Sequence, residues 1–391
     1  MSNGKPRNGW RSVKTTDILT GIITGKKDVN QAEQTGEYPF FSCARETTLF
    51  SNEFLLDADA ILVSGNGSYT GFVKSHSGKF DLYQRTYALF NFKEGVNWRF
   101  IYYLFKHYFE KRYMGGTSGA AIPYITKPVL TDFEFFVPQD NSIQNEVASI
   151  LTAYDDFIEN NRRRILLLEE SAHLLYKEWF VQLRFPGHAH VKIIDGVPDG
   201  WERKYLSEAI EVNPRTFADK GKEIKYVPMS SLSERGMTAN EEDFEIRSEH
   251  TTVKFQKNDV LLARITPSLE NGKTGFAYFL EEGEVACGST EFIVLRGIDV
   301  SPAFTYCLSR SYPLREKAIK SMIGSSGRQR VQVSCFDKFV VAVPPRFLMQ
   351  QFDEVANSLF SQIKVLAQEN KRLAQARDIL LPRLMTGELA V

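Results

Sequence analysis

Two long stretches with a seven-residue apolar repeat dominate the pattern of hydrophobic and polar positions along this chain. The repeated positions are Leu151, Ile158, Ile165, Ala172 and Trp179 in the first stretch, and Phe352, Leu359, Leu366, Leu373 and Leu380 in the second. In the first stretch, the alternating three- and four-residue steps are filled by Val147, Tyr154, Asn161, Leu168 and Leu175, and in the second stretch Glu, Lys, Arg and Gln lie between the repeated positions. Such stripes are typical of coiled-coil helices. Because each stripe is too narrow and too long to be covered by a small domain, we expect the two helices to pack against each other. Asn161 and Asn370, near the middle of the stripes, either fix the register of this pair or face solvent.

The ends of both helices can be predicted from proline positions. The first helix is expected to span residues 142–180, because Pro186 and Gly187 follow it, and at about 1.5 Å per residue it reaches nearly 60 Å. The second is expected to be interrupted at Pro382, which leaves a short tail over residues 384–391.

The second half of the chain repeats short blocks of the first half in the same order, which indicates a duplicated unit. The matched blocks are Gly9-Trp10 with Gly200-Trp201, residues 59–63 with 259–263, 71–73 with 275–277, 117–119 with 325–327, 137–138 with 343–344, and 146–148 with 354–356. The second and third pairs of blocks predict a β-hairpin in each half. Each Gly-Trp pair is expected to open a segment that runs into a helix.

The segments outside the long helices mix strand and helix patterns. Apolar runs at residues 133–137 and 339–343, with a helical pattern over residues 98–113, predict globular domains of the α+β class. A chain of 391 residues is long enough for two such domains. The predicted organisation is a globular domain over residues 1–141, a long helix over 142–187, a second globular domain over 188–345, and a second helix with a C-terminal tail over 346–391.

The net charge of zero gives no global signal for a nucleic-acid partner, but the charge is unevenly distributed. Residues 310–338 hold seven basic and two acidic side chains, a net +5, and the matching residues 106–127 hold four and one, a net +3. Residues 234–249 compensate with six acidic side chains against two arginines. Basic clusters therefore fall at equivalent places in the two halves.

Polar loops in and near these basic segments carry side chains that suit DNA. Arginine can donate two hydrogen bonds to guanine, and glutamine can bond adenine in the same way, so the run from Arg328 to Arg330 has the chemistry to read base edges. The alternative is a solvated loop that touches phosphates at most. The candidate DNA-contacting residues are Ser64, Asn66, Ser68, Tyr69, Thr117, Ser118, Arg264, Asn271, Lys273, Ser325, Ser326, Arg328, Gln329 and Arg330.

The catalytic motifs that the sequence suggests do not withstand inspection. The glycine-rich residues 65–71 precede a strand-like segment, whereas a dinucleotide site requires a helix there. The end of a phosphate-binding loop is suggested by residues 272–274, but Pro267 replaces its first glycine. His188 and His190 lack a third ligand, and the four cysteines are widely spaced. We expect neither a catalytic centre nor a metal site, and the missing apolar run of about 18 residues predicts a cytoplasmic protein without membrane contact.

The chain as a whole resembles the specificity subunit of a type I restriction-modification system. The blocks that carry this resemblance are Gly9-Trp10, Gly200-Trp201, residues 263–267 with 269–273, 343–345, 175–180 and 377–388. Their combination is specific, although no single block is. One departure from the pattern is the loop at residues 117–121, which lacks the polar side chains of its counterpart at Arg328 to Arg330.

The resemblance implies a noncatalytic subunit whose two globular domains are target recognition domains separated by an antiparallel coiled coil. It implies an asymmetric bipartite site in double-stranded DNA, with half-sites about one helical turn apart. Two methyltransferase subunits and restriction subunits would be its partners. S-adenosylmethionine, ATP and Mg would serve those partners, for adenine methylation and restriction, with no cofactor in this chain.

Two other functional classes were weighed against this resemblance. A two-domain coiled-coil adaptor that binds only protein would make the basic loops incidental. An enzyme with its own nuclease or methyltransferase centre is disfavoured, because no motif supports it. Steep loss of DNA affinity with rising salt would distinguish a DNA reader from the adaptor.

Overall fold

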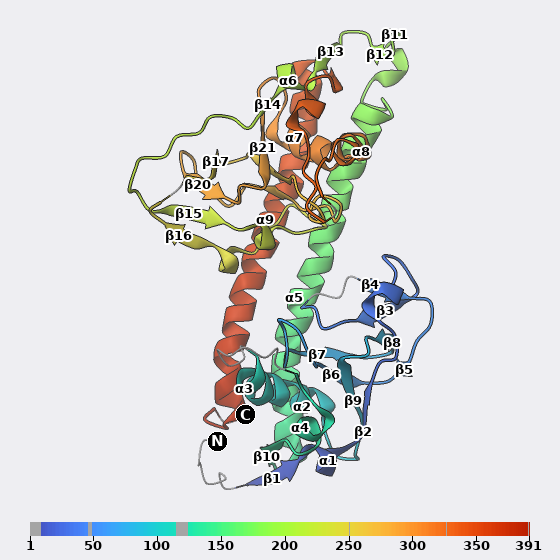
Figure 1. The fold of residues 1–391 in the computed structure, drawn as a ribbon, viewed down its shortest axis with the longest axis vertical. Helices are drawn as coiled ribbons and strands as arrows, with labels where there is room; N and C mark the ends of the chain where they lie inside the picture. The colour runs from blue at the N-terminus through green and yellow to red at the C-terminus, as the bar shows by residue number, and fades with distance from the viewer. Residues whose placement is uncertain (1–8, 46–48, 115–123, 250, 326, 390) are drawn as a thin grey trace. The chain divides into compact units, whose positions relative to one another are not determined.

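The computed structural model describes residues 9–45, 49–114, 124–249, 251–325, 327–389 and 391. Two compact units divide the chain. Unit 1 comprises Met1–Ile158 and Arg372–Val391, and unit 2 comprises Glu159–Lys371 (Figure 1). Both boundaries lie inside long helices, α5 (Asn141–Tyr176) and α9 (Arg346–Met385), so each helix contributes to both units.

Unit 1 is built from small sheets, short helices and the ends of the two long helices. Its other elements are β1 (Trp10–Lys14), α1 (Thr15–Ile18), β2 (Leu19–Thr24), η1 (Val29–Gln31), β3 (Tyr38–Phe41), β4 (Leu49–Ser51), β5 (Leu56–Asp57), β6 (Ala60–Ser64), β7 (Val73–His76), β8 (Lys79–Leu82), β9 (Thr86–Phe92), α2 (Trp98–Leu104), η2 (Phe105–Glu110), α3 (Lys111–Tyr113), α4 (Lys127–Thr131) and β10 (Glu134–Pro138).

Unit 2 is built from elements of the same kinds. They are η3 (Lys177–Val181), η4 (His188–His190), β11 (Ile193–Ile194), β12 (Val197–Pro198), β13 (Glu202–Tyr205), α6 (Leu206–Ala209), β14 (Ile210–Val212), β15 (Ile224–Val227), η5 (Met229–Ser231), η6 (Glu241–Asp243), β16 (Glu245–Arg247), β17 (Val253–Gln256), β18 (Val260–Ala263), β19 (Thr274–Phe276), β20 (Val285–Gly288), β21 (Phe292–Gly297), α7 (Pro302–Arg310), α8 (Tyr312–Lys320), η7 (Val333–Phe336) and β22 (Val340–Val343).

The strand order confirms the duplication that the sequence predicts. One sheet runs β2-β9-β6-β7 in unit 1 and β14-β21-β18-β19 in unit 2. A second runs β4-β3-β8-β5 and β16-β15-β20-β17, with a parallel pair at its centre in both units. The predicted hairpins are present as β6–β7 and β18–β19. The fold is therefore α+β, as expected.

The segments after the two Gly-Trp pairs run into a short helix, as expected, but only after a strand that was not predicted. Each begins with a strand, β1 or β13, which pairs with β10 or β22 just before a long helix. Only then does a single helical turn follow, α1 or α6. Most side chains of these two strands are exposed, so neither strand shows the alternation of apolar and polar residues that would predict it from the sequence.

Within each unit, α5 and α9 lie side by side (Figure 1). In unit 2, Asn161 Nδ2 lies 3.4 Å from Glu369 Oε2, whereas the Phe180 ring, just beyond α5, packs 4.9 Å from that of Phe352. The residue farther along the first helix thus contacts the residue nearer the start of α9, so the two helices are antiparallel. Asn161 is buried, so the alternative in which it faces solvent is wrong.

The predicted stripe residues lie at this helix interface to different degrees. Leu151, Ile158, Ile165, Ala172, Phe352 and Leu366 are buried, and Trp179, Leu359, Leu373 and Leu380 are partly buried. A second stripe on α9 was missed, because polar residues interrupt its apolar ones: Ala356, Ile363, Asn370, Arg377 and Leu384.

The expected interruption at Pro382 is wrong, because α9 continues to Met385. A proline removes one backbone donor from a helix. Here Leu381, Leu384 and Met385, around the proline, are all buried in the core of unit 1. Apolar burial near the helix end offsets the missing hydrogen bond.

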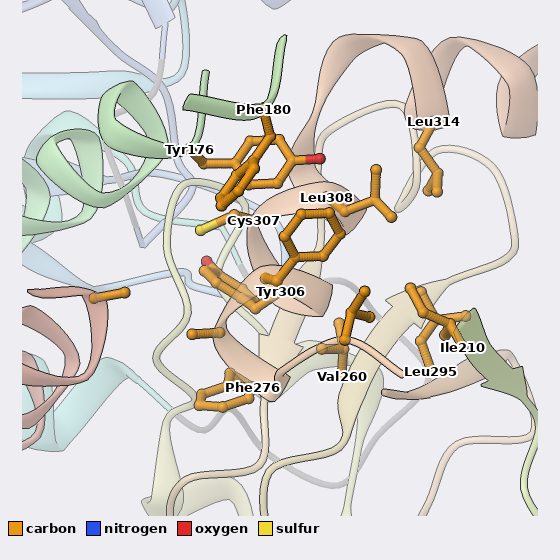
Figure 2. Close-up of a cluster of buried hydrophobic side chains, with 14 of the residues drawn as sticks. Tyr176, Phe180, Ile210, Val260, Phe276, Leu295, Tyr306, Cys307, Leu308 and Leu314 are labelled. Atoms are coloured by element: carbon orange, nitrogen blue, oxygen red, sulfur yellow. The ribbon is translucent and has the colours of Figure 1, made fainter. Parts of the chain in front are cut away.

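The core of unit 2 joins the long helices to the domain. Figure 2 shows Tyr176 and Phe180 gathered with Tyr306 of α7 and with strand residues such as Val260. The ring of Phe180 packs edge-on 4.9 Å from that of Phe304. Burial of large aromatic side chains on this scale fixes α5 firmly to unit 2.

Within the part of the chain that the structure describes, no helix has both the length and the apolar character needed to cross a bilayer.

Candidate nucleic-acid interface

In unit 2, the hairpin loop after β18 and the basic loop after α8 meet through their backbones. The Val331 amide donates to the Arg264 carbonyl at 2.8 Å. The Thr266 amide donates to the Gln329 carbonyl at 3.0 Å, and the Gln329 amide donates to Thr266 Oγ1 at 3.0 Å. The fold thus brings together candidate residues that are more than sixty positions apart.

Arg330 is the most firmly held member of this cluster. Its amide and carbonyl both bond Ile323, at 2.9 and 3.0 Å. Its side chain donates from Nε to both oxygens of Glu291, at 2.9 and 3.0 Å, and from Nη2 to Oε1 at 2.6 Å. These hydrogen bonds to Glu291 raise the pKa of Arg330, which therefore stays cationic. Arg264 Nε lies 3.9 Å from the same carboxylate.

The other unit 2 candidates are distributed differently. Ser325 and Arg328 are exposed, and within the described chain Arg328 has no side-chain partner; Ser326 lies outside the described residues. Asn271 Nδ2 donates to Glu234 Oε1 at 3.1 Å, and Lys273 Nζ donates to a backbone carbonyl, that of Met229, at 3.2 Å. Asn271 and Lys273 thus hold the loop around residues 229–234, and in the described chain their side chains form no hydrogen bond to Arg264 or Arg330.

Part of the +5 charge of residues 310–338 serves the fold. Arg310 donates to the carbonyls of Gly272 and Glu234, at 3.2 and 3.3 Å. Arg315 donates to the carbonyls of Leu269 and Glu270, both at 3.2 Å, and burial lowers its pKa. These two guanidinium groups are held by backbone carbonyls of the loops around residues 234 and 269–272. The net charge counted from the sequence is therefore larger than the positive charge available to bind DNA.

Unit 1 contains the same backbone arrangement with other side chains. The Gly65 amide donates to the Arg85 carbonyl at 2.8 Å, as the Arg264 amide donates to the Glu291 carbonyl at 3.0 Å. The Gly65 carbonyl accepts from the Ile125 amide at 2.7 Å, as that of Arg264 accepts from Val331. Gly65 therefore occupies the position of Arg264. A Cβ at Gly65 would lie 2.3 Å from the Arg85 carbonyl oxygen, so only glycine fits.

This equivalence corrects the sequence alignment of β6 with β18 by one residue. The aligned blocks pair Val63 with Ala263, but Val63 corresponds to Leu262, since these residues lie two positions before Gly65 and Arg264, respectively. Ser64, at the end of β6, is buried, and its hydroxyl donates to the Cys43 carbonyl at 3.4 Å. It is not displayed at the surface where a DNA contact was expected.

Two exposed residues of unit 1 were missed by sequence reasoning. Arg85 stands at the position of Glu291, and Tyr124, 73% exposed, precedes Ile125 as Arg330 precedes Val331. The nearby hairpin loop displays Ser68 and Tyr69, with Asn66 partly exposed. Thr117 and Ser118 lie outside the described residues.

A carboxylate of α5 anchors each unit to the long helix. In unit 1, Tyr103 of α2 donates to Asp155 Oδ2 at 2.7 Å. In unit 2, Tyr306 of α7 donates to the buried Glu169, which also accepts the Met237 amide at 3.0 Å. Burial raises the pKa of both tyrosines, so their hydroxyls remain protonated donors.

In the described chain, no group of side chains is arranged to hold a metal ion.

Comparisons with known proteins show similarity to specificity subunits of type I restriction enzymes. Residues 7–170 match the family model of the type I restriction modification DNA specificity domain. Over 165 residues the chain is 33% identical to the specificity subunit of the type I restriction enzyme EcoDI of Escherichia coli, which covers 42% of this chain and 35% of that protein. Over 313 residues it is 26% identical to the MjaIX specificity subunit of Methanocaldococcus jannaschii, covering 76% and 71%. The chain thus matches about a third of the first relative's length.

A solved structure of similar fold covers nearly the whole chain. It is the S subunit of a type I restriction-modification system from M. genitalium, with a TM-score of 0.53 at 17% identity, over 98% of this chain and 97% of that one. At this identity the likeness shows a shared fold.

Proposed function

We propose, on the premise that this chain is related to type I restriction enzyme specificity subunits and carries their specificity domain over residues 7–170, that it recognises an asymmetric bipartite DNA site. It has no catalytic role of its own and directs adenine methylation or restriction by partner subunits. The observation that carries this proposal is the pair of equivalent loop clusters, which present different side chains from the same backbone arrangement. Different side chains on a common frame suit two different half-sites.

The unit 2 cluster supplies the chemistry for reading bases. Arg328 and Arg330 can each donate two hydrogen bonds to guanine, and Gln329 can bond adenine through its amide. The cluster sits on a loop whose backbone is bonded on both sides to folded structure. A rigid support of this kind fixes the position of a reading side chain better than a free loop.

The partners are part of the same proposal. Two methyltransferase subunits, using S-adenosylmethionine, and restriction subunits, using ATP and Mg, supply the chemistry. An exposed apolar stripe on the unit 2 part of α5 and on η3, which follows it, supports a protein partner there: Leu167, Leu174 and Val181 are 62%, 51% and 47% exposed at seven-residue spacing. Because the chain is neutral overall, we expect it to bind DNA weakly alone and more tightly with its methyltransferase partner.

The test is selection of bound duplexes from a random-sequence library, followed by titration of the selected duplex at several salt concentrations. The full chain with its methyltransferase partner should enrich a bipartite sequence and lose affinity steeply as salt rises. Arg328→Ala should weaken discrimination at one position by about 1–3 kcal/mol. Arg162→Ala, an exposed arginine on α5, is the matched control and should leave the selected sequence unchanged. A chain that enriches no sequence, with or without the partner, would be a protein-binding adaptor instead.

A further inference from the structure

We infer that Glu291 is a positioning residue that orients Arg330 to recognise a guanine in the half-site read by unit 2. This inference rests on the proposed function and adds to it a residue that does not itself contact the base. It also identifies guanine as the base that Arg330 binds. Three features of the cluster carry it: the edge of the guanidinium that Glu291 occupies, the rigidity of the backbone beneath Arg330, and the balance of charge around the carboxylate.

Glu291 binds one edge of the Arg330 guanidinium and leaves the other open. The carboxylate accepts from Nε and Nη2, which form the side edge. Among the residues that the structure describes, Nη1 has no hydrogen-bond partner. A planar guanidinium offers its donors in a fixed fork, so the end edge of Nη1 and Nη2 still presents two parallel N–H groups. Guanine O6 and N7 are the two acceptors on a base edge that match such a fork.

The backbone under Arg330 is fixed before any ligand arrives. Arg330 bridges Ile323 on one side and Ile265 on the other. Glu291 is fixed as well, because its amide donates to Ser289 Oγ at 3.2 Å and its carbonyl accepts from Arg264. The Arg330 side chain is therefore held at both ends, which lowers the entropy cost of ordering it on a base.

The charge around Glu291 favours a supporting role over repulsion of DNA. The carboxylate is 22% exposed, whereas the Arg330 side chain is 44% exposed and so lies nearer to the surface. Arg264 is the second cation beside the carboxylate. Two arginines surrounding one glutamate leave a net charge of +1, so the cluster as a whole still attracts a polyanion.

The dependence on Glu291 should be confined to one half-site. At the corresponding place unit 1 has Arg85, and the position of Arg330 is taken by Tyr124. No carboxylate–guanidinium pair can form between those two side chains. The half-site read by unit 1 thus serves as an internal control in every experiment on Glu291.

The test is duplex selection from a random library with the full chain and its methyltransferase partner, using Glu291→Gln, Glu291→Asp, Arg330→Ala and wild type. The matched control is Glu245→Gln on β16, because Glu245 accepts from Nε and Nη2 of Arg247 at 2.9 and 2.6 Å, far from the loop cluster in sequence. The readouts are the base frequencies at each position and the affinities for selected and scrambled duplexes.

We expect wild type to select guanine at one position of one half-site and Arg330→Ala to abolish that preference. Glu291→Gln should reduce it about tenfold, the scale expected when one long side chain loses its preorganisation. Binding to scrambled duplex should not weaken, because a negative charge has been removed. Glu291→Asp should restore part of the preference, and Glu245→Gln should change nothing.

Two results would overturn the inference, and they can be told apart. If Arg330→Ala changes the selected base but Glu291→Gln does not, the positioning role is wrong and the proposed function stands. If wild type enriches no sequence at all, the proposed function fails, and this inference fails with it.

Discussion

Asp155 of α5 and Arg377 of α9 form an ion pair in unit 1, with Oδ1 and Nη1 2.5 Å apart. The side chain of Arg377 is only 14% exposed, and the other carboxylate oxygen of Asp155 accepts the Tyr103 hydroxyl. One carboxylate therefore joins both long helices to α2. The charged Arg377 can occupy a position in the second stripe of α9 because Asp155 of α5 pairs with it.

Replacing this carboxylate should destabilise unit 1. Asp155→Ala removes the acceptor of the Tyr103 hydroxyl and leaves the largely buried Arg377 guanidinium with only the neighbouring Asp378 as its carboxylate partner. We expect a loss of about 2 kcal/mol, discounted for partial exposure of the pair. Calorimetric unfolding of the full chain measures it. The control, Glu159→Ala, removes exposed pairs with Arg162 and Arg163 and should change stability by less than about 0.5 kcal/mol. Equal effects of the two variants would contradict the anchoring role of Asp155.

Arg85 and Tyr124 should determine the half-site read by unit 1. Arg85→Ala should relax base preference there by about 1–3 kcal/mol if the arginine contacts a base with two hydrogen bonds. Tyr124→Ala should also weaken that half-site, since the exposed ring is lost. Sequencing of methylated DNA from cells that express the variants with the methyltransferase checks both, with Lys14→Ala on β1 as control. The assignment would be refuted if these variants changed the base preference in the unit 2 half-site, or if they changed it at no position.

Elements that bury apolar residues in a regular pattern were predictable from the sequence. The seven-residue repeat from Leu151 to Trp179 revealed α5, because a helix that packs along its length must place apolar residues at that period. The strands β6 and β18 were visible as short continuous apolar runs, since each is buried on both faces.

The same double burial explains why the candidate site was only partly predictable. A strand without alternation of apolar and polar residues carries no signal for its register, so Val63 was aligned one residue away from its true counterpart. Because of that shift, the equivalence of Gly65 with Arg264 was not recognised, and Arg85 was not recognised as a candidate residue. The partner of Arg330 was also invisible, because Glu291 lies 39 residues away and is brought close only by the sheet.

The apolar stripe of Leu167 and Leu174 should bind a methyltransferase subunit. Leu167→Glu or Leu174→Glu should reduce co-purification of the two subunits at least tenfold, because each places a charge in an interface that excludes water. Thermal stability of the isolated chain should be unchanged, since both side chains are more than half exposed. Ile298→Glu, an equally exposed isoleucine outside the helices, is the control. Unimpaired co-purification of both leucine variants would show that the partner binds elsewhere.

The segments of α5 and α9 that connect unit 1 to unit 2 should set the spacing of the two half-sites. To test this, residues can be added to both helices. An insertion near Glu169 would disturb its hydrogen bonds with Tyr306 and Met237. Duplicating residues 152–158 after Ile158, and 365–371 after Lys371, instead adds seven residues to each helix at the boundary of the units and keeps the apolar stripes in phase. The added rise is about 10 Å, or about three base pairs at 3.4 Å each. Methylated-DNA sequencing should then report the same two half-sites with a spacer about three base pairs longer. Duplication in α5 alone unpairs the stripes and should abolish methylation. Recognition at the original spacing by the double duplication would show that the paired helices do not measure the distance.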